Sequence, residues 1–300
     1  MRIGVDLGGT KTEIIALDER GGERFRRRVP TPQRDYRATV HQIGDLVEAA
    51  ERATSHGTVG VGIPGTISPA TGLVKNANST WLNGERLRED LERRLARPLR
   101  IANDANCFAL SEATDGAAAG AGVVFGVIVG TGTGAGVVVQ GRIVVGANAI
   151  AGEWGHNPVP WPDADEWPGP ACYCGRTGCL ETFLSGPGLS RDHERTSGVH
   201  ADAGEISAAA ARGDHAACVS IERYEHRMAR GLASVMNVLD PDVIVLGGGL
   251  SNIRRLYEHV PRLWSRYVFS DAVTTRLVPA VHGDASGVRG AACLWTVDGR

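Results

Sequence analysis

The residues with the most specific chemistry in this sequence are three closely spaced cysteines. Cys172, Cys174 and Cys179 lie in a glycine-containing segment, and His156 lies upstream of them. Three thiolates and one imidazole can fill all four tetrahedral positions of a structural Zn²⁺. Unligated thiols or a disulfide are the alternatives for the cysteines, and a surface histidine is the alternative for His156. Because clustered cysteines in a cytosolic chain are typical of metal binding, the sequence predicts a zinc site.

Two glycine-rich turns are candidates for phosphate binding. The first reads Asp-Leu-Gly-Gly-Thr-Lys at residues 6–11, and the second reads Gly-Thr-Gly-Thr-Gly-Ala-Gly at residues 130–136. Backbone N–H groups in such turns can cradle phosphate oxygens, and Asp6 could bind Mg²⁺ directly or through water. The first does not match a Walker A loop, and the second lacks the following helix that a dinucleotide-binding loop requires. An ordinary hairpin turn is the alternative for each, but two such turns in one chain favour phosphate binding.

Asn103 and Asp104 lie where a strand is expected to lead into a helix. Transfer of a phosphoryl group to a sugar hydroxyl needs a carboxylate that accepts the hydroxyl proton. The sequence therefore predicts Asp104 as the base, and the alternative is a helix cap. If His156 binds zinc through one ring nitrogen, the other is free to bond a sugar hydroxyl. Glu153 and Glu181 could bond further hydroxyls, with a solvated surface as their alternative.

The strands and helices that must position these residues follow one arrangement twice. In each copy a strand leads into a glycine turn, two more strands follow, and helices come next. The expected strands are residues 3–7, 12–17, 24–29, 59–63, 99–102, 123–129, 137–139, 143–145 and 242–246. The expected helices are residues 36–53, 87–95, 106–118, 206–212, 214–239 and 287–295, with a further one after residue 252. This duplication predicts an α/β protein with domains of residues 1–118 and 119–286, and with the last helix, in residues 287–300, packed back on the first domain.

Composition bounds the classes of function. The chain has 300 residues and a formal net charge of −2, so it has no basic field for nucleic acid or an anionic membrane. Its first residues read as a strand and not as a signal peptide, and no apolar run is long enough to span a bilayer. Cys107, Cys218 and Cys293 lie in apolar, helix-like stretches that are typical of buried thiols. A cytoplasmic protein without nucleic-acid or membrane partners is therefore expected.

Four segments resemble signatures of the ROK family of repressors, open reading frames and kinases. They read DLGGTK at residues 6–11, NDAN at 103–106, GEWGH at 152–156 and CYCGRTGCLE at 172–181. They occur in the family's order and span most of the chain. The resemblance implies an actin/hexokinase-like (ribonuclease H-like) fold, with duplicated α/β domains around a central cleft. It also implies an ATP-dependent sugar kinase with a structural Zn²⁺, in a family whose members are often homodimers.

The resemblance assigns roles to the matched residues. Asp104 matches the catalytic base. The sugar-binding positions are Asn103, Asp104, Glu153, His156 and Glu181, and the zinc ligands are His156, Cys172, Cys174 and Cys179. With Asp6 for magnesium, the positions expected for MgATP are Asp6, Gly8, Gly9, Thr10, Lys11, Thr131, Gly132, Thr133, Gly247, Gly248 and Gly249. Residues 163–171 resemble no part of the family pattern.

Three further segments resemble bacterial fructokinases that also accept mannose. They are residues 75–83, 155–161 and 282–290. The expected reaction is therefore the phosphorylation of fructose to fructose 6-phosphate by ATP. Alternatives within the family are an N-acetylglucosamine or N-acetylmannosamine kinase, a glucokinase, a sugar-responsive repressor and a non-catalytic sugar sensor. A repressor of the family would carry a DNA-binding helix-turn-helix ahead of the first strand, and none is expected here. The intact Asp104 and both glycine turns argue against the sensor.

Overall fold

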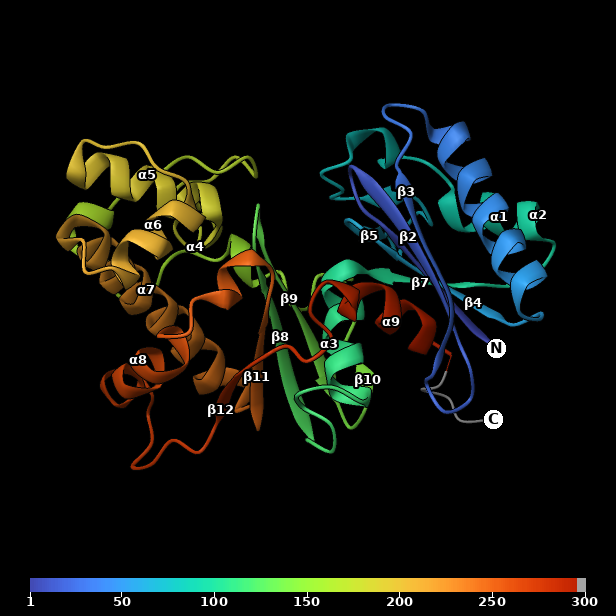
Figure 1. Ribbon diagram of the computed structural model, residues 1–300. Coiled ribbons are helices and arrows are strands. Elements are labelled where there is room, and N and C mark those ends of the chain that lie inside the picture. The colour runs from blue at the N-terminus through green and yellow to red at the C-terminus, as the bar shows by residue number, and fades with distance from the viewer. Residues whose placement is uncertain (296–300) are drawn as a thin grey trace. The chain divides into compact units, whose positions relative to one another are not determined.

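The computed structural model describes residues 1–295, and these form two compact units. The first unit contains Met1–Gly120, Gly136–Ala151 and the chain from Val281 onward. The second contains Ala121–Ala135 and Gly152–Ala280. Figure 1 shows strands and helices in both. The predicted α/β class is confirmed, and the domain limits at residues 118 and 286 stay predictions.

The first unit is built on a five-stranded mixed sheet with the order β3-β2-β1-β4-β7. Strands β1 (Arg2–Leu7), β2 (Lys11–Leu17) and β3 (Glu23–Pro30) are antiparallel, whereas β4 (Thr58–Ile63) and β7 (Arg100–Asn103) run parallel to β1. Parallel strands end at the same edge of a sheet. This edge therefore collects the residues that end β1 and β7, which include two predicted site residues.

Four helices cover the two faces of this sheet. Helices α1 (Tyr36–Ala53) and α2 (Leu87–Leu95) have the bounds expected from the sequence and lie on one face of the sheet (Figure 1). Helix α9 (Ser286–Cys293) packs on the other face, and α3 (Asp104–Thr114) packs on α9. The expected helix over residues 106–118 thus starts and ends earlier in the chain. The expected helix over 287–295 ends at Cys293, and the prediction for residues 296–300 lies outside the described residues.

Glycine at two strand positions allows α9 to approach the sheet closely. A Cβ atom on Gly4 would lie 2.2 Å from the carbonyl oxygen of Val288. A Cβ atom on Gly60 would lie 1.9 Å from the carbonyl oxygen of Ala291. Neither contact is sterically possible, so any other residue here would push the helix away. Helix α9 therefore fits closely against a sheet whose first strand begins at Arg2.

A buried carboxylate holds the chain where it enters α9. Glu112 on α3 has no solvent exposure. Its oxygens accept hydrogen bonds from the backbone N–H groups of Ala117 (2.9 Å), Val281 (3.0 Å) and His282 (3.1 Å) and from the hydroxyl of Ser286 (2.8 Å). These four hydrogen bonds offset much of the free-energy cost of burying the carboxylate.

Replacing Glu112 by alanine should lower the free energy of unfolding by about 3 kcal/mol, because buried N–H groups would lose their acceptor. Urea unfolding of the whole protein measures this change. Glu89→Ala, on an exposed face of α2, is the control, and its effect should stay below about 0.5 kcal/mol. Equal stability of the two variants would show that Glu112 does not hold the entry to α9.

The second five-stranded sheet has the order β10-β9-β8-β11-β12. Its strands are β8 (Val123–Val129), β9 (Thr133–Val139), β10 (Arg142–Ile143), β11 (Val243–Gly247) and β12 (Arg276–Pro279). The division between the two units falls within β9, after Ala135. The predicted strands over 123–129, 137–139 and 242–246 are found. The strand expected at 143–145 is confined to Arg142–Ile143, and β12 was not predicted because only one of its residues, Leu277, is buried.

The helices of the second unit pack around the longest of them. That helix is α7 (His215–Leu239), and α5 (Gly186–Ser197), α6 (Ala203–Ala211) and α8 (Leu256–Leu263) all contact it (Figure 1). A short helix, α4 (Glu181–Leu184), precedes α5. No helix in residues 1–295 has both the length and the apolar character needed to cross a membrane.

Helix α5 was missed in the sequence because its first residues, Gly-Pro-Gly, are typical of a turn. The hydroxyl of Ser185 caps the helix by accepting a hydrogen bond from the N–H of Gly188. Proline suits the first turn, where its missing N–H costs no hydrogen bond. The remaining elements are short. They are the strand pair Thr66–Ile67 and Val74–Lys75 and the 3₁₀ turns Thr80–Leu82, Trp154–His156, Ala164–Glu166, Gly249–Asn252, Trp264–Arg266 and Gly283–Ala285.

Candidate active site and metal centre

The four predicted zinc ligands come together in the second unit. The nitrogen or sulfur atoms of His156, Cys172, Cys174 and Cys179 all lie within 4.8 Å of one another. Nδ1 of His156 is 3.6 Å from the sulfur of Cys172, and the sulfurs of Cys174 and Cys179 are 3.6 Å apart. Tetrahedral Zn²⁺ with usual bond lengths separates two sulfurs by about 3.8 Å, and a nitrogen from a sulfur by about 3.5 Å. The residues present therefore fit a Cys₃His zinc centre.

The backbone explains why these ligands meet. Leu180 N–H bonds the carbonyl of Asn157 at 2.8 Å, which pairs the segment after His156 with the segment of Cys179. The N–H of Cys172 bonds the carbonyl of Arg176 at 2.8 Å, which closes the cysteine loop. Gly175 and Gly178 turn this loop with φ of +87° and +69°, where other residues are strained.

The second ring nitrogen of His156 has a partner that the sequence did not reveal. Its Nε2 is 2.9 Å from the hydroxyl of Tyr173, and the two rings meet edge to face with centroids 5.1 Å apart. Desolvation of the hydroxyl, and then the negative charges of Glu181 and Glu153, raise the pKa of Tyr173 to about 12. Tyr173 thus lies among the second-unit residues that were predicted to bind sugar.

Glu181 connects the cysteine loop to the second glycine turn. Its carboxylate accepts a hydrogen bond from the N–H of Thr133 at 2.9 Å. A Cβ atom on Gly132 would lie 2.9 Å from the same carboxylate oxygen, and one on Gly155 would lie 1.9 Å from the carbonyl of Thr133. Glycine is therefore needed at residue 155, where the contact is with backbone, whereas a side chain at residue 132 would displace the carboxylate of Glu181. Glu181 is tied into the unit and is not a freely solvated surface residue.

Trp154 anchors the segment that carries Glu153 and His156. It is 3% exposed, and its indole N–H donates to the carbonyl of Gly231 at 3.0 Å. The indole also packs edge to face on Phe125, with ring centroids 5.9 Å apart. The predicted sugar-binding residues on either side of this tryptophan are therefore held by a buried aromatic ring.

Asn103 and Asp104 have different roles at the start of α3, in the first unit. The Oδ1 atom of Asn103 caps the helix by accepting hydrogen bonds from Ala105 N–H (2.9 Å) and Asn106 N–H (3.3 Å). Its Nδ2 donates to the carbonyl of Gly65 at 3.1 Å. The cap is therefore Asn103, and Asp104 is the first residue of the helix. The helix-cap role, which was the alternative for Asp104, is therefore filled by Asn103.

Asp104 acts electrostatically on a second carboxylate, that of Asp6. Burial, then the charges of Asp104 and Glu13, raise the pKa of Asp6 to about 7. A Cβ atom on Gly287 would lie 2.9 Å from Asp6 Oδ2, so α9 closes one side of this carboxylate. Carboxylates whose charges interact in this way repel each other, and a cation bound beside Asp6 would offset that repulsion. Oxygen ligands of this kind suit Mg²⁺.

The first glycine turn joins β1 to β2 as a tight hairpin turn, and neighbouring side chains hold its carbonyl groups. Gly8 N–H bonds the carbonyl of Lys11 at 2.9 Å. The carbonyl oxygen of Gly8 accepts from the hydroxyl of Thr31 at 2.8 Å, and that of Gly9 accepts from Nε2 of Gln33 at 2.7 Å. Lys11 is exposed, as is Thr10. The phosphate-binding role of this turn stays a prediction.

The second unit contains a cavity beside its glycine turn, of about 820 Å³. Two of the residues expected to bind MgATP, Thr131 and Gly249, line it, whereas Gly132 and Thr133 face Glu181. The other predicted glycines do not line it but shape the nearby chain: Gly247 ends β11, and a Cβ on Gly248 would lie 2.4 Å from the carbonyl of Val129. Gly130, the first residue of the glycine turn, lines it too. The lining residues that sequence analysis missed are mostly on α5, α6 and the turn after Gly248: Gly186, Pro187, Ser190, Asp202, Ala203, Gly204, Ser207, Ala208, Ala211, Leu250, Asn252 and Ile253.

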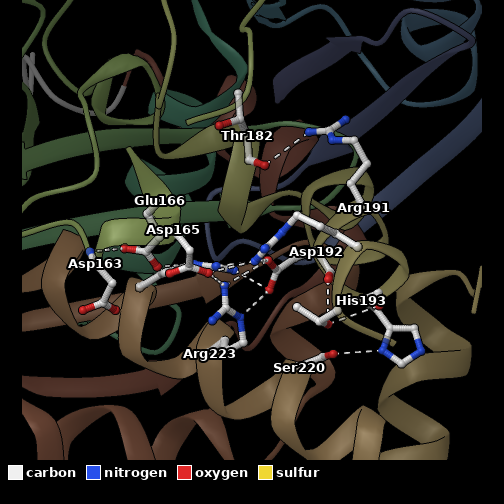
Figure 2. A network of polar contacts seen from close by, with 12 residues as sticks. Asp163, Asp165, Glu166, Thr182, Arg191, Asp192, His193, Ser220 and Arg223 are labelled. Atoms are coloured by element: carbon white, nitrogen blue, oxygen red, sulfur yellow. Dashed lines mark hydrogen bonds and ion pairs between the residues drawn. The ribbon is translucent and has the colours of Figure 1, made fainter. Parts of the chain in front are cut away.

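The segment of residues 163–171, which had no role in the sequence, is fixed by a buried network of ion pairs (Figure 2). Glu166 is 4% exposed and pairs with Arg227 and Arg230 of α7, both at 2.7 Å. Asp192 of α5 pairs with Arg227 at 2.7 Å and with Arg223 at 3.0 Å. Although burial opposes it, these arginines hold the pKa of Asp192 well below its usual range. The network joins this segment to α5 and α7.

Comparison with known proteins decides the family. The model described as the ROK family matches residues 2–297. This chain belongs to the ROK family. An N-acetyl-D-glucosamine kinase of Yersinia enterocolitica is 40% identical over 299 residues, which cover 98% of this chain and 99% of that protein.

Solved structures of ROK proteins share the fold. A ROK hexokinase from Thermus thermophilus is 32% identical with a TM-score of 0.85, covering 97% of this chain and 96% of that one. A ROK family glucokinase from Streptomyces griseus, in complex with glucose and AMPPNP, is 27% identical with a TM-score of 0.77, covering 97% and 98% of the two chains. The predicted actin/hexokinase-like fold is thereby confirmed. The subclass is not, because the Yersinia relative matches the N-acetylglucosamine alternative and not fructokinase.

Proposed function

We propose that this ROK protein transfers the γ-phosphoryl group of ATP to a hexose. The observation that carries the proposal is that Asp6, near the end of β1, and Asp104, directly after β7, lie at one edge of the first unit's sheet, beside the first glycine turn. A base for the sugar hydroxyl and a carboxylate for the magnesium of MgATP are the two acidic groups that this reaction needs. The names of the Thermus and Streptomyces proteins support the same reaction class.

In the proposed mechanism, Asp104 accepts the proton of the attacking sugar hydroxyl. The sugar oxygen then bonds to the γ-phosphorus as the bond from that phosphorus to the β,γ-bridging oxygen breaks, and ADP leaves. Asn103 fixes the backbone that carries Asp104 through its hydrogen bonds to the helix start and to Gly65. Lys11 and the N–H groups of both glycine turns offset the charge of the phosphates.

The remaining residues bind the two substrates. The cavity lined by Thr131 and Gly249 has the size of a small-molecule site, and we assign it to the adenosine part of ATP. We assign Glu153, His156 and Glu181 to sugar hydroxyls. A bound Zn²⁺ would brace the loop that carries these groups, with all four positions taken by His156 and the three cysteines.

The acceptor sugar is assigned from two different kinds of evidence. Identity over the full chain favours N-acetyl-D-glucosamine, because the Yersinia relative acts on it by name. Overall identity, however, reflects the shared fold and reaction, whereas the choice of sugar depends on the few groups that contact it. Residues 155–161, which include His156 and its flanking segment, resemble fructokinases. We therefore propose fructose, with mannose as a second substrate, and keep N-acetyl-D-glucosamine as the candidate favoured by the relative.

Release of ADP from MgATP, measured with each sugar alone, tests both levels of this proposal. Fructose, mannose, glucose, N-acetylglucosamine and N-acetylmannosamine should be compared by kcat/KM. The highest value for fructose would support the proposed substrate, and the highest value for N-acetylglucosamine would replace it and keep the kinase. The absence of turnover with every hexose, in folded protein that contains zinc, would reject the proposed kinase function. Dimer formation and a cytoplasmic location stay predictions.

A further inference from the structure

In the sequence, Tyr173 lies between two predicted zinc ligands, Cys172 and Cys174, and its hydroxyl is hydrogen-bonded to a third, His156. Its hydroxyl is 2.9 Å from Nε2 of His156, while Nδ1 of that histidine faces the sulfur of Cys172 at 3.6 Å. Both ring nitrogens of His156 therefore have a partner within the second unit. The partner of Nε2 is a phenol, whose hydroxyl resembles a sugar hydroxyl in its hydrogen bonding.

One imidazole nitrogen cannot serve two hydroxyls well. Each ring nitrogen carries either one hydrogen or one lone pair in the ring plane, and so makes one well-directed hydrogen bond. In the proposed function, Nε2 of His156 is the atom that bonds the sugar. Tyr173 and the sugar must then compete for it. Tyr173 is 73% exposed, so it can turn into solvent without leaving a cavity in the core.

We propose that Tyr173 occupies the sugar's place on His156 in the free protein and that a bound hexose displaces it. This inference rests on the proposed function, and it makes Tyr173 a residue that sets affinity for the sugar. Every hexose must replace the bond between tyrosine and histidine with one of its own. A sugar with a hydroxyl directed at Nε2 recovers that bond, whereas an analogue without this hydroxyl leaves the nitrogen unpaired and should bind poorly.

Tyr173→Phe tests the inference because it removes the competing hydroxyl and keeps the ring. The KM for the preferred hexose should fall by about two- to tenfold, the range expected when one exchanged hydrogen bond is removed. The kcat and the KM for ATP should stay within about twofold of the original. The Kd for the hexose, measured by calorimetry without ATP, should fall by the same factor as KM. Tyr173→Leu should change Kd in the same direction.

Tyr267→Phe is the control, since that tyrosine stacks on Trp161 at a ring distance of 5.4 Å and has no part in the proposal. Zinc content and melting temperature should match in all variants. A higher Kd for Tyr173→Phe would mean that the hydroxyl contacts the sugar directly, and an unchanged Kd would mean that it does not compete. Either result overturns the inference without affecting the proposed kinase function. Absence of hexose binding and turnover in the unaltered protein would reject the proposed function, and this inference with it.

Discussion

Asp104→Asn is expected to lower kcat by about two to four orders of magnitude, the usual contribution of a general base. Asparagine keeps the size of the side chain and its place at the start of α3, but it cannot accept the proton of a sugar hydroxyl. Because Asn103 provides the cap of this helix, the substitution should leave the fold intact. Hexose affinity, measured by calorimetry, should change by less than about threefold, since binding does not require the proton transfer.

Asp240→Asn is the matched control for that substitution. Asp240 is exposed and ends α7 with φ of +47°, a conformation that asparagine tolerates well. The same chemical change there should leave kcat within about twofold. If Asp104→Asn retained more than a tenth of the original kcat, another group would have to serve as the base.

Cys179→Ser is expected to remove zinc and to lower the melting temperature by roughly 10 °C. Cys179 is 1% exposed and brings its sulfur within 3.6 Å of Cys174. The hydroxyl of serine is a poor ligand for Zn²⁺, and a structural zinc site contributes directly to folding free energy. A loss of several kcal/mol in the free energy of unfolding lowers the melting temperature of a protein of this size by about 10 °C. Activity should fall as well, because Glu181 follows this cysteine closely in the chain.

Metal analysis and calorimetric melting measure these effects together. Unaltered protein should contain about one zinc per chain, and a strong chelator should reproduce the lower melting temperature of Cys179→Ser. Cys218→Ser, at a half-buried cysteine of α7, should leave both values unchanged. Full stability of the unaltered chain after complete removal of the metal would end the structural role assigned to zinc.

Sequence reasoning predicted the local geometry well where a motif and an element boundary coincide. Strand β7 ends at Asn103 and α3 begins at Asp104, close to the expected junction. The four zinc ligands were predicted from the types and spacing of their residues, which local turns bring together. In both cases the information is local, because a few neighbouring residues decide the geometry.

The parts that were missed depend on contacts between distant segments. The bond from Tyr173 to His156 requires a loop closure that no periodic pattern encodes. Helix α5 begins with turn residues, and its stability comes from burial against α7 and from ion pairs such as Asp192 with Arg227. The cavity beside Thr131 is lined largely by α5 and α6. Its residues carry no signature of their own, so only the packing of these helices identifies them.

The fit of α9 against β1 and β4 has a consequence for how the protein is made. The strands of the first sheet leave the ribosome before every segment of the second unit, whereas helix α9, which covers one of their faces, follows all of those segments in the chain. Translation at about 5–20 residues per second leaves that face uncovered until α9 has been made. The first unit therefore completes its fold only once the segment from Val281 onward has emerged, and its apolar strands stay exposed to other nascent chains in the meantime. The second unit, whose segments lie between residues 121 and 280, is free to finish before it.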